Sequence, residues 1–297
     1  MIEIFLIIFS VLLIVSGIFL LNYRLEEKPQ NAFTQRIPAW WVLALLSLLS
    51  FLLGDIGTIL LFCAVSFLIL REFLALVCDR LADYHAMVAA FYLILPLQYI
   101  FVLMDWYDLF SLFIPVYAFF ILPVLTSITS HSSDFLMRAA KIQWAVVVSI
   151  FCISHIPAIM HLSVSNKPNT LLIIFLFIII QASELFSMLW RKLFQQQKTL
   201  TTTWITALAG VLFASVLSFY LSPYFTPFTP LQAMLVGFII SVMGFVGHLV
   251  MFAIKQDRGI KVRAHTHDYD SILNYMLGIG FAAPVYFHIL RHIFQLA

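Results

Sequence analysis

Long hydrophobic runs, interrupted by short polar stretches, extend over almost the whole chain. A helix needs about 20 mainly apolar residues to cross a bilayer, and most of the runs approach that length. The pattern therefore predicts an all-α, polytopic transmembrane helical bundle of about ten helices. The expected spans are residues 2–22, 39–53, 56–75, 86–104, 107–126, 143–162, 170–190, 203–221, 231–254 and 270–294.

We expect these spans to form a single integral membrane domain, residues 1–297, because no linker is long enough to separate two domains. We divide it into N-terminal helices within 1–126 and site-bearing C-terminal helices within 143–297. The run at 39–53 is short, and we expect it to tilt or to insert only halfway. The first run has Glu3 and no basic flank, which favours a retained helix over a cleaved signal peptide.

Composition supports the membrane interpretation. The 297 residues are 63% hydrophobic and 10% charged, whereas soluble domains contain roughly a quarter charged residues. The three cysteines, Cys63, Cys78 and Cys152, are scattered and lack a CxxC spacing. We expect them to pack as small apolar side chains and not to form disulfides or a metal knuckle.

Basic residues fall in alternate connections. With the N-terminus outside, only Lys167 and Arg291 of the sixteen lysines and arginines face outwards, as the positive-inside rule requires. We therefore expect the cell's inner (cytoplasmic) membrane, with both termini outside. The basic cytoplasmic face has two explanations. Positive-inside bias alone produces it, or it attracts anionic lipid headgroups or a nucleotide triphosphate.

The ninth span has a stripe of small residues that ends in a histidine. Gly237, Ser241, Gly244 and His248 share one helical face, where small residues let another backbone approach closely. An ionisable group at membrane depth marks a candidate functional site. The polar turn that follows contains Lys255, Arg258, Lys261, Arg263, His265, His267, Asp268 and Asp270.

Two ionisable side chains are predicted at matching depth. Glu184 precedes Arg191 by seven residues, and His248 precedes Lys255 by seven. At 1.5 Å per residue each lies roughly 10 Å below the basic loops. A carboxylate at that depth needs a partner, so we expect Glu184 and His248 to meet. Either this pair only fixes helix packing, or it belongs to a functional site.

Other histidines offer further chemistry. His155 is followed two residues later by Pro157. Proline has no N–H, so it leaves one backbone carbonyl of the preceding turn without a donor. We expect the His155 ring to bond that carbonyl; the alternative is that it contacts a lipid headgroup. The turn His265-x-His267-Asp268-x-Asp270 combines imidazole and carboxylate groups, which suit zinc or manganese. Its spacing matches no tight metal signature, so a solvated turn is the other interpretation.

Several short segments, among them GHLVM at 247–251, AIK at 253–255 and APVYF at 283–287, together resemble the CDP-diacylglycerol synthase family, also called phosphatidate cytidylyltransferase. The resemblance runs over nearly the whole chain. It implies a polytopic bundle that binds CTP and phosphatidate at its cytoplasmic side, uses magnesium and releases pyrophosphate. The similar segments are RIPAWW at 36–41, SFLILREF at 66–73, LFIP at 112–115, SH at 154–155, GHLVM at 247–251, AIK at 253–255, GIK at 259–261, DS at 270–271 and APVYF at 283–287.

The family's C-terminal signature reads S-x-I-K-R-x4-K-D-x-G-x2-L-P-x-H-G-G-x2-D-R-x-D. This chain keeps Ile254, Lys255 and Lys261, but the P-x-H-G-G turn is missing and the loop is eight residues shorter. Glu184 stands at one acidic position of the family, whereas His248 and His267 replace two others, and the family's Gly-Lys loop has no counterpart. Magnesium prefers oxygen ligands, and a triphosphate needs N–H or cationic groups. The resemblance thus implies that this chain has lost much of the family's site for CTP and magnesium.

The resemblance and the depth argument assign roles to the same region. The candidates are Asp270, Lys255 and Lys261 for catalysis; Glu184, Ser183, Arg263 and His155 for substrate binding; and His248, His267 and Asp270 for a metal. The cofactor is Mg²⁺ if the family mechanism survives, and otherwise Zn²⁺, Mn²⁺ or none. The expected partners are a phosphatidate-like phospholipid, CTP, the membrane, and a second copy or another lipid enzyme, without nucleic acid.

Three functions remain open at this point. The first is a phosphatidate cytidylyltransferase-like membrane protein with a degenerate CTP and magnesium site, acting as a lipid-binding or partner pseudoenzyme of phospholipid biosynthesis. The second is a divergent but active CTP:phosphatidate cytidylyltransferase that makes CDP-diacylglycerol. The third is changed chemistry at a His/Asp metal site.

Overall fold

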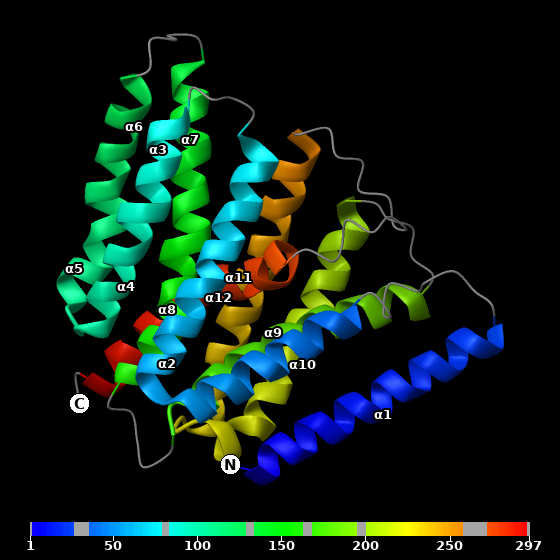
Figure 1. The fold of residues 1–297 in the computed structure, drawn as a ribbon. Coiled ribbons are helices and arrows are strands. Elements are labelled where there is room, and N and C mark those ends of the chain that lie inside the picture. Colours follow the sequence, from blue (N-terminus) through cyan, green and yellow to red (C-terminus); the bar gives the residue numbers. More distant parts are fainter. Residues whose placement is uncertain are drawn as a thin grey trace.

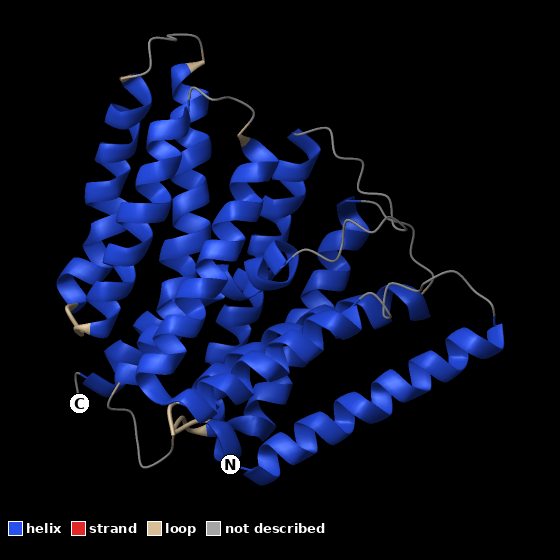
Figure 2. Ribbon diagram, viewed as in Figure 1, coloured by secondary structure: helices blue, strands red, loops and turns tan. Residues whose placement is uncertain are grey.

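Every regular element in the described part of the chain is a helix (Figure 2). The computed structural model describes residues 2–26, 36–78, 83–128, 134–162, 168–194, 200–257 and 272–295. Within these ranges, eight helical segments are long and apolar enough to cross a membrane. The expected all-α bundle is confirmed, and the protein is a multi-pass membrane protein.

Some spans are single helices, whereas others are several helical pieces joined end to end. The single helices are α1 (Ile2–Glu26), α2 (Ile37–Val77), α9 (Thr170–Leu193), α10 (Leu200–Phe225), α11 (Pro230–Asp257) and α12 (Ile272–Gln295). The joined pieces are α3 (Tyr84–Ala89), η3 (Ala90–Ile94) and α4 (Leu95–Leu103); α5 (Tyr107–Leu112), η4 (Phe113–Ala118) and α6 (Phe119–Ser127); and α7 (Phe135–Val146), η5 (Val147–Phe151), α8 (Cys152–Ala158) and η6 (Ile159–His161). In each joined span a π-helical stretch, with its wider turn, interrupts the α-helix.

Helix α2 contains two of the predicted spans, folded back on each other at one residue. Gly54 has φ 67° and ψ −164°, a conformation that a residue without a side chain adopts readily. The hydroxyl of Thr58 donates to the carbonyls of Ser50 (3.0 Å) and Gly54 (2.7 Å), the first before the kink and the second at it. The predicted spans 39–53 and 56–75 are the two arms of this V (Figure 1).

The sixth predicted span begins earlier than expected. Hydropathy places its start at residue 143, whereas the helix already begins at Phe135 with α7. The reason is Arg138, whose charge lowers the hydropathy of this turn although its side chain is only 5% exposed. Its Nε donates to Oδ1 of Asp83 at 2.7 Å, so the charge is buried together with its partner. A paired charge of this kind is compatible with a buried helix.

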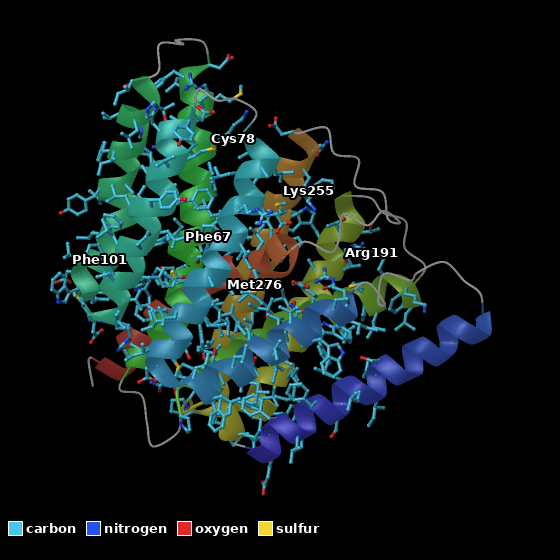
Figure 3. The ribbon with its side chains drawn as sticks, in the orientation of Figure 1. Phe67, Cys78, Phe101, Arg191, Lys255 and Met276 are labelled. Carbon is cyan, nitrogen blue, oxygen red and sulfur yellow. The ribbon has the colours of Figure 1, made fainter. Side chains whose placement is uncertain are left out.

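Helices α9 to α12 pack in order, each against the next, and α12 also contacts α2 and α8. The chain termini lie at the same end of the bundle, which we call the terminal end (Figure 1). The C-terminal ends of α6 and α11 and the N-terminal end of α7 lie at the opposite end of the bundle (Figure 1). Lys255 in the last turn of α11 marks this basic end (Figure 3).

Candidate functional site

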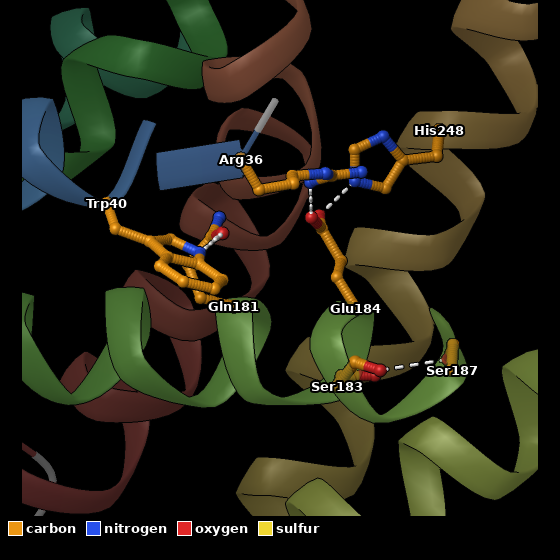
Figure 4. A network of polar contacts seen from close by, with 7 residues as sticks. All are labelled: Arg36, Trp40, Gln181, Ser183, Glu184, Ser187 and His248. Atoms are coloured by element: carbon orange, nitrogen blue, oxygen red, sulfur yellow. Dashed lines mark hydrogen bonds and ion pairs between the residues drawn. The ribbon is translucent and has the colours of Figure 1, made fainter. Parts of the chain in front are cut away.

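A carboxylate in α9 is held by two groups from other helices (Figure 4). The guanidinium of Arg36, at the start of α2, donates to Oε2 of Glu184. The imidazole Nε2 of His248, in α11, hydrogen-bonds the other oxygen, Oε1. We call these three residues the Glu184 cluster. Both carboxylate oxygens are therefore engaged by groups of the chain itself.

The exposure of the cluster is uneven. The Glu184 side chain is 12% exposed, whereas those of Arg36 and His248 are 23% and 28% exposed. The carboxylate therefore lies deepest, and its two partners lie between it and the surroundings. A ligand that approaches this site meets a guanidinium and an imidazole before it meets the carboxylate.

Helix α12 makes room for the cluster by having a glycine beside it. A Cβ on Gly278 would lie 2.8 Å from Nε2 of His248 and 3.2 Å from Oε1 of Glu184. Gly247 of α11 faces the same place, because a Cβ there would lie 3.2 Å from Cα of Gly278. Helices α11 and α12 thus approach closely at two glycines, and the Glu184–His248 pair fills the space that Gly278 leaves.

The predicted stripe of small residues lies at helix contacts. A Cβ on Gly237 would overlap Ser218 of α10, and one on Gly244 would lie 3.4 Å from Ile180 of α9. Ser241, between them, is buried. The stripe therefore serves close packing of α11, as the sequence predicts. This packing brings His248, at its end, to α9.

Two further polar contacts lie next to the cluster on α9. Gln181, one turn before Glu184, accepts a 3.1 Å hydrogen bond from Nε1 of Trp40 in α2. Ser183 lies on the other side of α9 from the Glu184 carboxylate (Figure 4). Its carbonyl accepts a 2.8 Å hydrogen bond from Ser187, and the residue itself is buried. Ser183 therefore belongs to helix packing in this structure.

The predicted contact between Glu184 and His248 is confirmed, but the sequence analysis missed Arg36 as their partner. A signal for it exists. A carboxylate within a membrane needs a cationic or hydrogen-bonding partner, and Arg36 starts the second hydrophobic run at the matching end of the bundle. Helical periodicity could not reveal the contact, because the two residues are 148 positions apart.

The remaining candidates near this end are only partly described. Lys255 is half-buried in the last turn of α11. Lys261, Arg263, His267 and Asp270 lie outside the described residues, which resume with α12.

Glu72 contacts the start of α12. A carboxylate oxygen of Glu72, in the second arm of α2, accepts the backbone N–H of Leu273 at 3.0 Å. A carboxylate satisfies a free N–H at a helix start, where the helix dipole also favours negative charge. Glu72 thus fixes the first turn of α12.

His155 lies apart from the Glu184 cluster. It is fully buried, with the rings of Phe110 and Phe151 both at 4.6 Å between centres. Its Nδ1 is 2.7 Å from the carbonyl oxygen of Phe151, so the expectation of a bond to the carbonyl freed by Pro157 is wrong. That carbonyl belongs to Ile153, two residues before His155 and on another face, whereas a helical side chain leans back over the preceding turn.

The described residues do not fit a magnesium site. Magnesium prefers several oxygen ligands in octahedral geometry, whereas the cluster supplies one carboxylate, and both of its oxygens bond Arg36 and His248. Among the described residues no three His, Cys, Asp or Glu side chains gather as metal ligands do. The predicted metal ligands His267 and Asp270 lie outside that part of the chain.

Comparison with known proteins assigns the sequence to a family. The model of the Cytidylyltransferase family matches residues 34–266. The chain belongs to the cytidylyltransferase family. The matched range includes Arg36, Glu184 and His248. Over 279 residues, 92% of both sequences, the chain is 29% identical to the uncharacterized protein YnbB of Escherichia coli (strain K12). No solved structure matches the chain.

Proposed function

We propose that this chain is a phosphatidate cytidylyltransferase-like membrane protein whose CTP and magnesium site is degenerate. In this role it acts as a lipid-binding or partner pseudoenzyme of phospholipid biosynthesis. One observation carries the proposal: both carboxylate oxygens of Glu184 are engaged by Arg36 and His248. Membership of the cytidylyltransferase family and the membrane-spanning helices support the broader assignment.

The charge of the cluster explains why we favour a degenerate site. The resemblance to CDP-diacylglycerol synthase puts two acidic family positions on Glu184 and His248. Two carboxylates would attract a divalent cation, whereas Glu184 with Arg36 has no net charge and His248 carries no negative charge in either of its protonation states. The cluster therefore lacks the negative field that holds magnesium and its attached phosphates.

Lipid binding is supported by the exposed side of the same cluster. Arg36 and His248 are the more exposed members, and a guanidinium presents several N–H donors to a phosphate. A phosphatidate-like headgroup entering from the bilayer would meet these donors first. We place the cluster on the cytoplasmic side of the inner membrane, with both termini outside. The positive-inside pattern and the shared end of the two termini support this orientation.

The decisive experiment is a cytidylyl-transfer assay on the purified full chain. It measures pyrophosphate release from CTP and phosphatidate, with magnesium, manganese and zinc supplied separately. We expect no turnover with any of the three metals, from protein that size-exclusion chromatography shows to be folded. Turnover with magnesium that disappears in Asp270→Ala would overturn the proposal and make Lys255, Lys261 and Asp270 the catalytic set. Turnover with only manganese or zinc would instead favour metal chemistry at His248, His267 and Asp270.

A further inference from the structure

A concave surface lies along α12, away from the Glu184 cluster. It is an open groove of about 660 Å³ in the last turns of this helix, within the usual size range of ligand sites, roughly 300–1,000 Å³. We call it the terminal groove. It is lined by Phe151, Pro284, Val285, His288, Ile289, His292 and Ile293.

The terminal groove lies within a membrane-spanning segment, Met276–Ile293. Its aliphatic and aromatic walls suit an acyl chain, since lipid tails surround a transmembrane helix at this depth. Two imidazoles, those of His288 and His292, interrupt the apolar lining on one face of α12. A purely hydrocarbon surface would need no such groups. The groove therefore combines an apolar wall with hydrogen-bonding groups, as the two parts of a phospholipid require.

The guanidinium of Arg291 lies beside the groove. The OH of Tyr107, in α5, lies 3.3 Å from Nδ1 of His288. The guanidinium carbon of Arg291 lies 3.3 Å from the centre of the same tyrosine ring. Tyr107 thus joins His288 of the groove to Arg291. Because positive charge near the membrane surface attracts anionic lipids, this arrangement favours a negatively charged headgroup.

The layer behind His288 contains an unpaired polar atom. The ring of His155 is fully buried, and its centre is 5.4 Å from that of His288. A carbonyl only accepts, so the Phe151 carbonyl requires a proton on Nδ1 of His155, which makes Nε2 an acceptor. This Nε2 has no hydrogen-bond partner among the described residues. A ligand hydroxyl or a water that enters beside His288 would satisfy it.

We propose that the terminal groove binds one anionic phospholipid from the leaflet opposite the Glu184 cluster. One acyl chain lies along Val285 and Ile289, and the phosphate lies near His292, His288 and Arg291. A second copy of the chain fits this surface less well. An isologous contact centred on the groove would bring two Arg291 side chains together. The proposal concerns a different surface from the Glu184 cluster and does not depend on the function proposed for that cluster.

Native mass spectrometry of the detergent-purified full chain tests this inference. The probes are phosphatidylglycerol and phosphatidylcholine with the same acyl chains. We expect the unsubstituted chain to retain one lipid more than Ile289→Trp does, so that a lipid at the Glu184 cluster does not enter the count, and we expect this lipid to be preferentially phosphatidylglycerol. Ile289→Trp fills the groove and should abolish that retention. The matched control is Ile239→Trp, on a partly exposed face of α11, and it should retain the lipid. Arg291→Gln should reduce the preference by about fivefold, the effect of one basic residue near a membrane surface.

The other outcomes overturn the inference in distinguishable ways. An unchanged number of retained lipids in Ile289→Trp, in protein that elutes like the unsubstituted chain, would exclude the groove. Retention that is lost in Arg36→Gln but kept in Ile289→Trp would place the lipid at the Glu184 cluster. A dimer that Ile289→Trp converts to monomer would identify a second copy as the occupant. A failed cytidylyl assay or a successful one leaves this test unaffected.

Discussion

The guanidinium of Arg36, at the start of α2, donates to Oε2 of Glu184, which lies 148 residues later in α9. This contact joins the N-terminal and C-terminal halves of the chain at the candidate site. The two members depend on it unequally, because Glu184 is the more buried. A carboxylate that loses its cation inside a protein keeps its desolvation penalty without compensation.

We therefore expect Arg36→Gln to destabilise the protein by about 3 kcal/mol, within the range for breaking a buried ion pair. Glu184→Gln should cost less, because Arg36 is the more exposed partner. The double variant should be more stable than Arg36→Gln alone. Unfolding of purified protein in mixed detergent measures all three. Equal and additive losses would show that the contact contributes no coupling energy.

Gly278→Ala should disturb the Glu184–His248 pair directly. The added methyl would lie 2.8 Å from Nε2 of His248, so either the pair or α12 must move. We expect a loss of about 1–3 kcal/mol, as for overpacking in a core. The control is Gly17→Ala in α1, where a Cβ meets nothing within 4 Å and the change should be neutral or slightly stabilising. A neutral Gly278→Ala in the same unfolding assay would contradict the close fit.

Glu72→Ala should loosen the first turn of α12. The substitution removes the acceptor of the Leu273 N–H, and the loss of such a cap costs about 1 kcal/mol. Glu72→Gln keeps an oxygen acceptor and should cost less. Hydrogen–deuterium exchange of the peptide that begins at Ile272 measures the effect. Glu3→Ala, an exposed acidic residue in the first turn of α1, should leave that exchange unchanged. Identical exchange in Glu72→Ala would remove the proposed anchoring role.

Arg138→Met should be among the more damaging changes at the basic end. It leaves the Asp83 carboxylate buried without the partner that it now contacts at 2.7 Å. We expect a loss of about 3–5 kcal/mol. Lys141→Met, less than one turn further on and half-buried, should change stability little. Thermal unfolding measured side by side checks the pair, and equal effects would mean that the Asp83 contact is dispensable.

The hydrophobic pattern predicted the spans well because membrane helices must satisfy their own backbone hydrogen bonds and be apolar along their length. It also placed Glu184 and His248 at one depth, since each lies two turns below a basic loop. Depth along a helix follows from residue spacing alone. This is why a contact between α9 and α11 could be predicted without knowing how the helices are arranged.

The rest depended on packing that spacing does not encode. Arg36 contacts Glu184 only because the first arm of α2 lies against α9, and no local pattern shows this. The hydropathy pattern places Arg138 outside the span because it treats every charge as exposed, whereas Arg138 is buried in an ion pair with Asp83. The position of Pro157 does not predict which carbonyl His155 bonds, because a helical side chain leans towards the previous turn and so reaches Phe151.

The kink at Gly54 determines which residues of α2 can reach the site together. A straight helix of 41 residues would be about 62 Å long, roughly twice the hydrocarbon thickness of a bilayer. Gly54 divides this length into two arms. Arg36 lies 18 residues before Gly54 (54 − 36), and Glu72 lies 18 residues after it (72 − 54). One arm delivers the cation of the Glu184 cluster, and the other delivers the carboxylate that holds α12. Inserting or deleting one residue in either arm would rotate its terminal group by about 100° about the helix axis. Each arm must therefore keep its exact number of residues, although the hydrogen-bond and ion-pair partners of the Glu184 carboxylate in the described structure are Arg36 and His248, and no residue between Arg36 and Glu72 is among them.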